Sequence, residues 1–297
     1  MRRAKKMKNN TLDDITKKLE KGIKDVMTGS GSQYKEWLKF ISSFHTYSFN
    51  NAMLIFLQNP NATLVKGYKD WRKLGRYVKK GEKAIRILAP IISNKKDKSK
   101  EEKKEKQEKK KTEEEKKELE IKGFRYVNVF DISQTDGKPL PKSIKPQMLE
   151  GNSEELKQLL NDWIKAIDIP VVFENTGSAN GYYHLVDNYI AIHEERSTMQ
   201  QLKTLVHEYA HHLLHRKNGG EFHTASTDIK ESQAESVAFI VMAHYNFDTS
   251  QYSFPYVAGW SGDIDIIKKI GTDIIKCSHV IIEKLGTKEQ SKEVVTA

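Results

Sequence analysis

The sequence predicts an α+β protein that is divided into two domains. Its 297 residues exceed the roughly 100–200 residues of a typical single domain. Apolar residues recur at helical spacing along most of the chain, and a few short apolar runs have the length and composition of strands. The segment DGKPLPKSIKPQM (136–148) contains three prolines and is the best candidate for a domain boundary. We therefore place one domain at residues 11–140 and a second at residues 150–287.

The first domain is expected to begin with helices. A first apolar-periodic stretch is broken by glycine and serine residues at 29–32, and a second, rich in aromatic residues, follows it. The next apolar run stops at Pro60, because proline cannot continue a helix. A short helix is then expected at 69–74, ended by Gly75.

Two strands, at 83–92 and 124–132, are expected next, with a highly charged insertion between them. Residues 95–120 contain no aromatic residue and a single aliphatic residue, Leu119. Such a segment cannot pack into a core, so we expect a solvated hairpin insertion that is disordered or forms a lone charged helix. Its 12 basic and 10 acidic residues nearly balance, which argues against a dedicated arm for nucleic acid.

The second domain is expected to contain amphipathic helices and two short strands. The final apolar-periodic stretch can be read as one helix or as a pair. In chain order, the expected elements are a helix at 153–167, strands at 170–176 and 182–193, helices at 197–215 and 228–244, and the helical stretch at 263–285.

The net charge of +10 is distributed unevenly. Residues 1–145 carry a net charge of +18 and residues 146–297 a net charge of −8, which suggests that only the first half meets a polyanion. No run approaches the about 18–20 apolar residues that cross a bilayer, and no apolar secretion signal follows the basic N-terminus. Cys277 is the only cysteine, which excludes intrachain disulfides and cysteine-based zinc sites. We therefore expect a cytoplasmic protein without a membrane partner.

The strongest chemical signal is the sequence His-Glu-Tyr-Ala-His at residues 207–211. On a helix, positions i and i+4 lie on one face, so His207 and His211 can bind one metal ion. Glu208 lies beside them and can accept a proton from a water molecule in an open coordination position. Zinc lowers the pKa of such a water to about 7, which makes hydroxide available at neutral pH. The pattern therefore predicts a Zn²⁺ site with Glu208 as general base.

A third protein ligand is expected downstream, where Glu231 and Glu235 are spaced i and i+4 on a predicted helix. In the gluzincin pattern, a ligand glutamate is followed four positions later by an acidic residue that orients a ligating histidine. We therefore assign Glu231 as the ligand and Glu235 as the orienting residue, with the reverse assignment as the alternative. His212 and His215 lie off the ligand positions, and we interpret them as surface or packing residues. His223 is interpreted as a solvated loop residue.

Aromatic and basic residues alternate in the first domain between Tyr47 and Lys83. Basic side chains neutralise phosphates and aromatic rings stack on unpaired bases, a combination that favours single-stranded over double-stranded nucleic acid. In the alternative interpretation, the aromatic residues belong to the core and the lysines to a solvated face. The candidate contact residues are Tyr47, Asn51, Trp71, Arg72, Arg76, Tyr77, Lys79, Lys80 and Lys83.

These segments resemble one known family. The run YSFNNAMLIFLQNPNATLVKGYKDWRKLGRYVKKGEKAIRILAPI, followed by FRYVNVFDISQTDGKPLP, is similar to the N-terminal domain of ArdC-type antirestriction proteins and to LtrC-like proteins of conjugative elements. The motifs LVHEYAHHLLH and ESQAESVAFIV look like the zincin-type metallopeptidase domain of that family, which is related to ImmA/IrrE peptidases. The resemblance covers about residues 33–285 without the charged insertion.

The resemblance implies a small α+β domain that binds single-stranded DNA, followed by a zincin-like metallopeptidase domain. It also implies a protein of a plasmid or integrative element that shields or accompanies incoming DNA against host restriction. By position in the motif, His207, His211 and Glu231 carry over as zinc ligands and Glu208 as general base. Two alternatives stay open: a regulatory metalloprotease that cleaves a repressor or host protein, and a DNA-binding protein with a purely structural zinc domain.

Overall fold

The computed structural model describes residues 16–29, 31–93, 120–140, 153–216, 225–248 and 263–286. Helices and small sheets both occur in these segments, which confirms the predicted α+β class. None of the described helices is both long and apolar enough to cross a lipid bilayer. The charged insertion up to residue 119, most of the proline-rich linker and the loop that contains His223 lie outside the described residues.

The N-terminal domain combines helices with a long antiparallel hairpin. Residues 16–28 are helical. The further helices are α2 (Gly31–Phe44), α3 (Phe49–Gln58), α4 (Tyr68–Lys73) and the 3-10 turn η1 (Ile132–Gln134). The strands are β1 (Val65–Gly67), β2 (Arg76–Val78), β3 (Ile85–Ser93), β4 (Glu120–Asp131) and β5 (Thr135–Gly137). β1, β4 and β3 form one antiparallel sheet in that order, and β2 pairs with β5, so the predicted hairpin is confirmed.

Local chemistry fixes the turns of this domain. Gly75 follows α4 with a φ of +72°, a conformation that a side chain would strain, which explains why the helix ends there. The buried carboxylate of Asp131 accepts hydrogen bonds from the backbone N–H groups of Thr63, Leu64 and Ser133. One side chain therefore ties the end of β4 to the loop before β1.

The described part of the C-terminal domain combines four helices with a small mixed sheet. Its elements are α5 (Glu154–Ala166), β6 (Val171–Glu174), β7 (Gly181–His184), β8 (Tyr189–His193), α6 (Thr198–His215), α7 (Thr227–His244) and α8 (Ile264–Gly286). β8 lies between β6, to which it is parallel, and β7, to which it is antiparallel. The stretch 182–193, expected as a strand, is two strands joined by a turn in which Asn188 has a positive φ. Ser153 and Ser197 cap α5 and α6 by accepting hydrogen bonds from backbone N–H groups.

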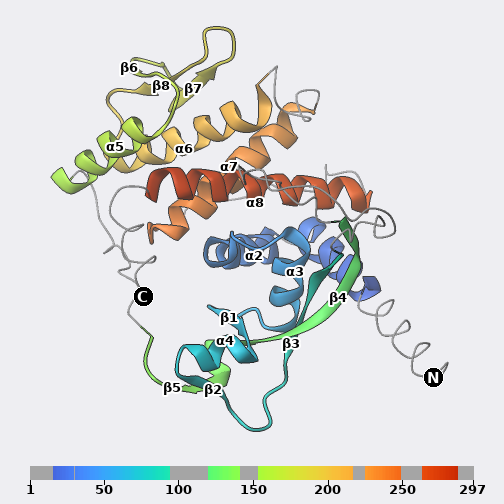
Figure 1. The fold of residues 1–297 in the computed structure, drawn as a ribbon. Coiled ribbons are helices and arrows are strands. Elements are labelled where there is room, and N and C mark those ends of the chain that lie inside the picture. The colour runs from blue at the N-terminus through green and yellow to red at the C-terminus, as the bar shows by residue number, and fades with distance from the viewer. Residues whose placement is uncertain are drawn as a thin grey trace, which may run out of the picture.

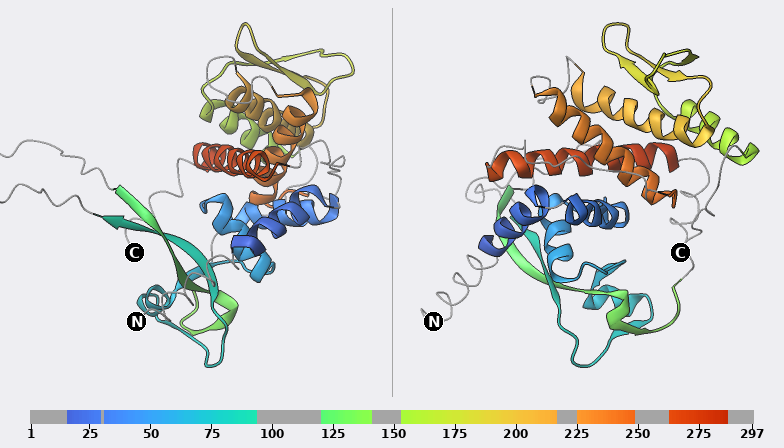
Figure 2. Two further views of the ribbon diagram at one scale, coloured as in Figure 1. Left: turned by 90° about the vertical axis from the view of Figure 1, so that its right-hand side faces the viewer. Right: turned by 180° about the vertical axis from the view of Figure 1, so that it is seen from behind.

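Helices α6, α7, α8, α2 and α3 stack in layers between the β6-β8-β7 sheet and the β1-β4-β3 sheet (Figure 1). The sheet of the C-terminal domain packs on α6, and α7 lies between α6, α8 and α2. α3 contacts α8 on one side and β3 on the other. The two further views show the same order, with the helices of both domains in the centre and the sheets outside them (Figure 2).

One continuous core joins the two domains. Buried apolar residues of α2 and α3 belong to the same cluster as those of α7 and α8. At the junction, the hydroxyl of Tyr34 lies 2.8 Å from Oγ of Ser236, and both residues are buried. Gly271 of α8 faces Phe49 so closely that a Cβ there would lie 2.2 Å from its ring. Glycine at this position therefore lets α8 approach the start of α3.

Three histidines meet at the same junction, from the end of α2, the end of α7 and the middle of α8. The Nδ1 atoms of His45 and His279 are 3.0 Å apart, and the rings of His45 and His244 meet edge to face at 5.0 Å. His244 donates a hydrogen bond from Nδ1 to the carbonyl of Ser42, and His279 lies 3.4 Å from Glu283. Burial, and then repulsion from His244 and His279, lowers the pKa of His45 to about 4.

This cluster predicts a loss of stability in mild acid. As the pH falls, the unfolded chain protonates His45 near its ordinary pKa of about 6.5, whereas the folded chain takes up that proton only near pH 4. Stability is therefore fully present above about pH 6.5 and decreases towards pH 4, by on the order of 1–2 kcal/mol after allowance for solvent screening. Urea unfolding midpoints at pH 7, 5.5 and 4.5 measure this effect, and His45→Gln should flatten the profile. Identical pH profiles for the two proteins would contradict the assignment.

Candidate metal centre

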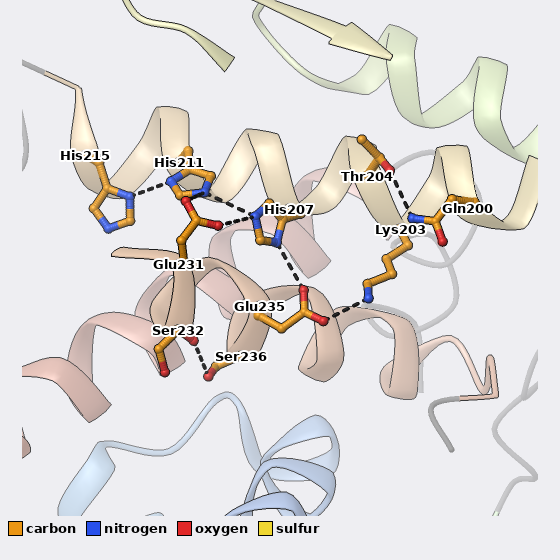
Figure 3. A network of polar contacts seen from close by, with 10 residues as sticks. All are labelled: Gln200, Lys203, Thr204, His207, His211, His215, Glu231, Ser232, Glu235 and Ser236. Carbon is orange, nitrogen blue, oxygen red and sulfur yellow. Dashed lines mark hydrogen bonds and ion pairs between the residues drawn. The ribbon is translucent and has the colours of Figure 1, made fainter. Parts of the chain in front are cut away.

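Helix α6 presents the two motif histidines on one face, one turn apart (Figure 3). Their side chains are only 17% and 14% exposed, and their Nε2 atoms are 3.1 Å apart. Leu205 and Val206, which directly precede His207, belong to the apolar core, so the histidines lie at the edge of the buried face. The i, i+4 spacing has therefore placed two imidazoles side by side as predicted.

Helix α7 brings a carboxylate to the same point. Glu231 Oε2 lies 3.3 Å from His207 Nε2, and Glu231 Oε1 lies 3.3 Å from His211 Nε2. His207, His211 and Glu231 form the one group of metal-binding type found among the described residues, with ligand atoms within 4.8 Å of one another. Tetrahedral zinc with bonds of about 2.0–2.2 Å holds neighbouring ligand atoms about 3.3–3.5 Å apart. The three donor atoms therefore already have nearly the spacing that such an ion requires.

Glu235 lies behind His207 and not beside the other donors. Its Oε2 is 3.2 Å from His207 Nδ1. Its Oε1 forms an ion pair with Lys203 Nζ at 2.8 Å. Figure 3 shows this row running from Lys203 through Glu235 to His207. Of the two assignments left open by the sequence, the geometry matches Glu231 as ligand and Glu235 as the residue that orients a histidine.

The electrostatics of the cluster favour a cation. Burial alone would lower the pKa of His207, but hydrogen bonds to Glu231 and Glu235 outweigh burial and raise this pKa to about 9. Contact with the imidazoles of His207 and His211 lowers the pKa of Glu231. The carboxylates of Glu231 and Glu235 thus keep His207 protonated in the absence of metal. The same negative charge would stabilise a metal cation bound at this place.

Glu208 points into a cleft beside the two histidines. Burial raises the pKa of its carboxyl group, and the carboxylate accepts a hydrogen bond from the backbone N–H of Tyr183 in β7. The cleft has a volume of about 180 Å³. Its lining residues are Asn180, Gly181, Gln200, Lys203, Thr204, His207, Glu208 and Glu235.

The interpretation of His215 as a surface or packing residue missed a polar contact. His215 is buried, and its Nδ1 lies 2.9 Å from Nδ1 of His211, while its Nε2 lies 3.1 Å from Oε1 of Gln233. The signal for His215 was present in the sequence as a second i, i+4 step after His211. Gln233 carried no such signal, because its contact with α6 exists only in the tertiary structure. His212 does pack, with its ring stacked on Tyr209.

Several candidate DNA contacts of the N-terminal domain instead hold the fold together. Trp71 is fully buried and its Nε1 donates a hydrogen bond to the carbonyl of Phe130, so it cannot stack on a base. Asn51 bonds through both ends of its amide to the backbone of Leu88. The prediction that these two side chains contact DNA was therefore wrong, because both are used by the fold. Tyr47 is partly buried and donates its hydroxyl hydrogen to a backbone carbonyl.

The remaining candidates differ in their hydrogen bonds to the backbone and in their exposure to solvent. Arg76 donates hydrogen bonds to the backbone of Thr135 and Lys138, and Lys79 donates one to a backbone carbonyl. The exposed candidates are Arg72, Tyr77, Lys79, Lys80 and Lys83, of which Tyr77 is 54% exposed. The aromatic side chains were thus mainly structural, while several of the basic residues lie on the surface.

A groove near Lys83 was not foreseen from the sequence. It has a volume of about 590 Å³ and lies between residues of the first helix, α3 and the β3–β4 hairpin. Its lining contains three basic and no acidic residues, together with apolar and amide side chains. The lining residues are Lys18, Leu19, Leu54, Leu57, Gln58, Lys83, Ala84, Arg86 and Asn128.

Comparison with known families accounts for both halves. A family model described as the N-terminal domain of the anti-restriction factor ArdC matches residues 5–130. A second model, of the IrrE N-terminal-like domain in peptidase family M78, matches residues 164–253. The chain joins an ArdC-type domain to an IrrE-like domain. This confirms the resemblance inferred from the sequence motifs.

Individual relatives agree with this domain arrangement. Two crystal structures of the antirestriction protein ArdC from plasmid R388, one metal-free and one with Mn(II), are each 20% identical to this chain. Each match covers 82% of this chain and 86% of ArdC, with TM-scores of 0.54 and 0.50, and shows a shared fold. Uncharacterized protein pXO2-81 of Bacillus anthracis is 28% identical over 310 residues, covering 96% of this chain and 51% of that protein. The chain therefore spans about half the length of this curated relative.

The geometry of the IrrE-like domain predicts different effects for its two glutamates. Glu231→Gln should weaken Zn²⁺ affinity by roughly 100-fold or more, because it replaces the anionic carboxylate ligand with a neutral amide, which is a much weaker donor. Glu235→Gln should weaken affinity by about 10–100-fold, as is typical for residues that orient a ligating histidine. Competition with a chromogenic chelator measures both affinities. The reverse order of effects would make Glu235 the ligand.

Proposed function

We propose that the IrrE-like domain is a metal-dependent peptidase centred on His207, His211 and Glu231, with Glu208 as general base. One observation carries this proposal: the Nε2 atoms of His207 and His211 lie 3.1 Å apart and each lies 3.3 Å from one carboxylate oxygen of Glu231, while Glu208 lines the adjoining cleft. Two imidazoles and one carboxylate are a common ligand set of catalytic zinc. The Mn(II)-bound form of ArdC, a protein of the same fold, supports a divalent ion more generally.

The surroundings of Glu208 suit it to carry a proton. Burial raises the pKa of its carboxyl group, which brings the group closer to the range in which it can both accept and release a proton near neutral pH. The hydrogen bond from Tyr183 fixes its direction. When bound, the metal ion would act as a Lewis acid and lower the pKa of a water molecule. Glu208 would accept the proton of that water and deliver it to the leaving amine.

An extended peptide fits the other wall of the cleft. β7 is an edge strand in the order β6-β8-β7, and Asn180 and Gly181 at its start line the cleft. An edge strand offers unpaired backbone groups that can bind an extended chain by adding a strand. We therefore propose a protein substrate, and a repressor or host protein is the candidate class.

Glu208→Gln tests the peptidase. The substitution keeps the shape of the side chain but removes the base, so cleavage should fall by about 100- to 10,000-fold while Zn²⁺ affinity is retained. Cleavage of an unbiased peptide library, followed by mass spectrometry, measures the activity. Equal cleavage by the variant and the parent would exclude Glu208 as the base. If cleavage is absent in both and metal removal only lowers the melting temperature, the zinc domain is structural.

We further propose that the ArdC-type domain binds single-stranded DNA and that the protein acts in antirestriction. The groove that contains Lys83 favours this second function, because its lining combines cationic and apolar side chains and contains no acidic residue. Lysine and arginine can pair with phosphates, while the exposed side chain of Leu57 can contact the face of an unpaired base. Shielding of incoming single strands from host nucleases would follow from such binding.

Charge removal in the groove tests DNA binding. The double variant Lys83→Ala and Arg86→Ala should bind a single-stranded oligonucleotide more weakly, and its affinity should depend less steeply on salt because two phosphate contacts are lost. Fluorescence anisotropy at several salt concentrations measures both. The double variant Lys157→Ala and Lys165→Ala on α5 makes the same charge change in the other domain and should leave binding unchanged. Equal losses in both double variants would mean that only net charge matters.

A further inference from the structure

A row of three side chains extends behind His211, from α6 into the interface with α7. His215 lies one helical turn after His211 and is 5% exposed, and Gln233 is fully buried. The Nδ1 atoms of His211 and His215 are 2.9 Å apart, and Nε2 of His215 lies 3.1 Å from Oε1 of Gln233. Figure 3 shows His215 directly beside His211, on the side away from His207.

We propose that His215 and Gln233 are positioning residues that hold His211 in the tautomer able to bind metal. The oxygen of Gln233 can only accept, so the proton of His215 lies on Nε2. Nδ1 of a neutral His215 then carries a lone pair and accepts the proton on Nδ1 of His211. This leaves Nε2 of His211 without a proton, facing His207 and Glu231. The inference rests on the metal centre proposed above.

The opposite orientation of the amide would disable the site. If the NH₂ group of Gln233 faced His215, each hydrogen bond in the row would reverse and a proton would occupy Nε2 of His211. A protonated nitrogen has no lone pair for a metal ion, so the direction of this row decides whether His211 is a ligand. The orientation of the buried Gln233 amide therefore determines whether His211, two side chains away, can bind a metal ion.

The two ligand histidines are held by different chemistry. His207 is backed by the ionised pair of Glu235 and Lys203, whereas His211 is backed by two neutral groups. A carboxylate makes the imidazole it holds a stronger donor than a neutral partner does. His211 consequently depends on hydrogen-bond direction alone, and removal of its neutral partner should weaken metal binding without any change in the charge of the site.

Substitutions of His215 and its neighbour test the row. His215→Leu cannot accept a hydrogen bond and should bind Zn²⁺ about 10–100-fold more weakly, whereas His215→Gln keeps an accepting carbonyl and should recover most of the affinity. His212→Leu is the matched control, because His212 is equally buried on the same helix but contacts Tyr183 and Tyr209. It should bind Zn²⁺ as the parent does. Competition with a chromogenic chelator measures all four proteins.

A second measurement needs no metal, and its main result comes from the parent protein without any substitution. In the metal-free full-length protein labelled with ¹⁵N-histidine, NMR should show the proton of His211 on Nδ1 and that of His215 on Nε2. Gln233→Leu should give His211 a mixture of tautomers. A proton on Nε2 of His211 in the parent, or parental Zn²⁺ affinity in His215→Leu, would overturn the inference.

The Zn²⁺ affinities also distinguish an error in the proposed metal centre from an error in the role of His215. A parent protein without Zn²⁺ affinity would reject the proposed centre and with it the role of the row. A parent that binds Zn²⁺, with His215→Leu and His212→Leu weakened equally, would leave the centre in place and reduce His215 to a packing residue.

Discussion

The enclosure of α7 by α6, α8 and α2 is the constraint on which the rest of the structure depends. Every residue of this helix from Ser236 to Met242 is buried, and small residues such as Ala234, Ser236 and Ala238 allow its neighbours to approach closely. Because α7 cannot rotate without disturbing all three partners, Glu231 stays opposite the histidines of α6. The precision of the candidate metal centre therefore comes from helix packing and does not depend on the metal.

The charges of the centre complement this packing. A cluster of carboxylates in a partly buried site would repel itself if no cation balanced it. His207 supplies that balance when protonated, and a divalent ion would replace the proton at the same place. Lys203 balances Glu235 separately, so the charge available to a metal ion is mainly that of Glu231 and Glu208.

Sequence patterns were most informative where the chemistry is local. The spacing within 207–211 and between Glu231 and Glu235 depends on one helix at a time, so helical periodicity alone placed these side chains on the correct faces. The row behind His211 needed the register between α6 and α7, which no local pattern contains. In the N-terminal domain, Trp71 looked like a stacking platform, because sequence composition does not distinguish a buried ring from an exposed one. The pairing of β1 with β4 and of β2 with β5 likewise depends on contacts between distant residues.

The hydrogen bond between Tyr34 and Ser236 has a consequence for how the molecule unfolds. Ser236 directly follows Glu235 in the chain, so the reverse side of the helix that carries the acidic residues is the docking surface for α2. The two family matches, at residues 5–130 and 164–253, divide the chain into modules of different families, but the shared core makes them one cooperative unit. Separated at the linker, the IrrE-like half would expose the apolar faces of α7 and α8 to water and would be prone to aggregate. The evolutionary boundary of the two modules and the physical boundary of the folding unit are therefore different places in this protein.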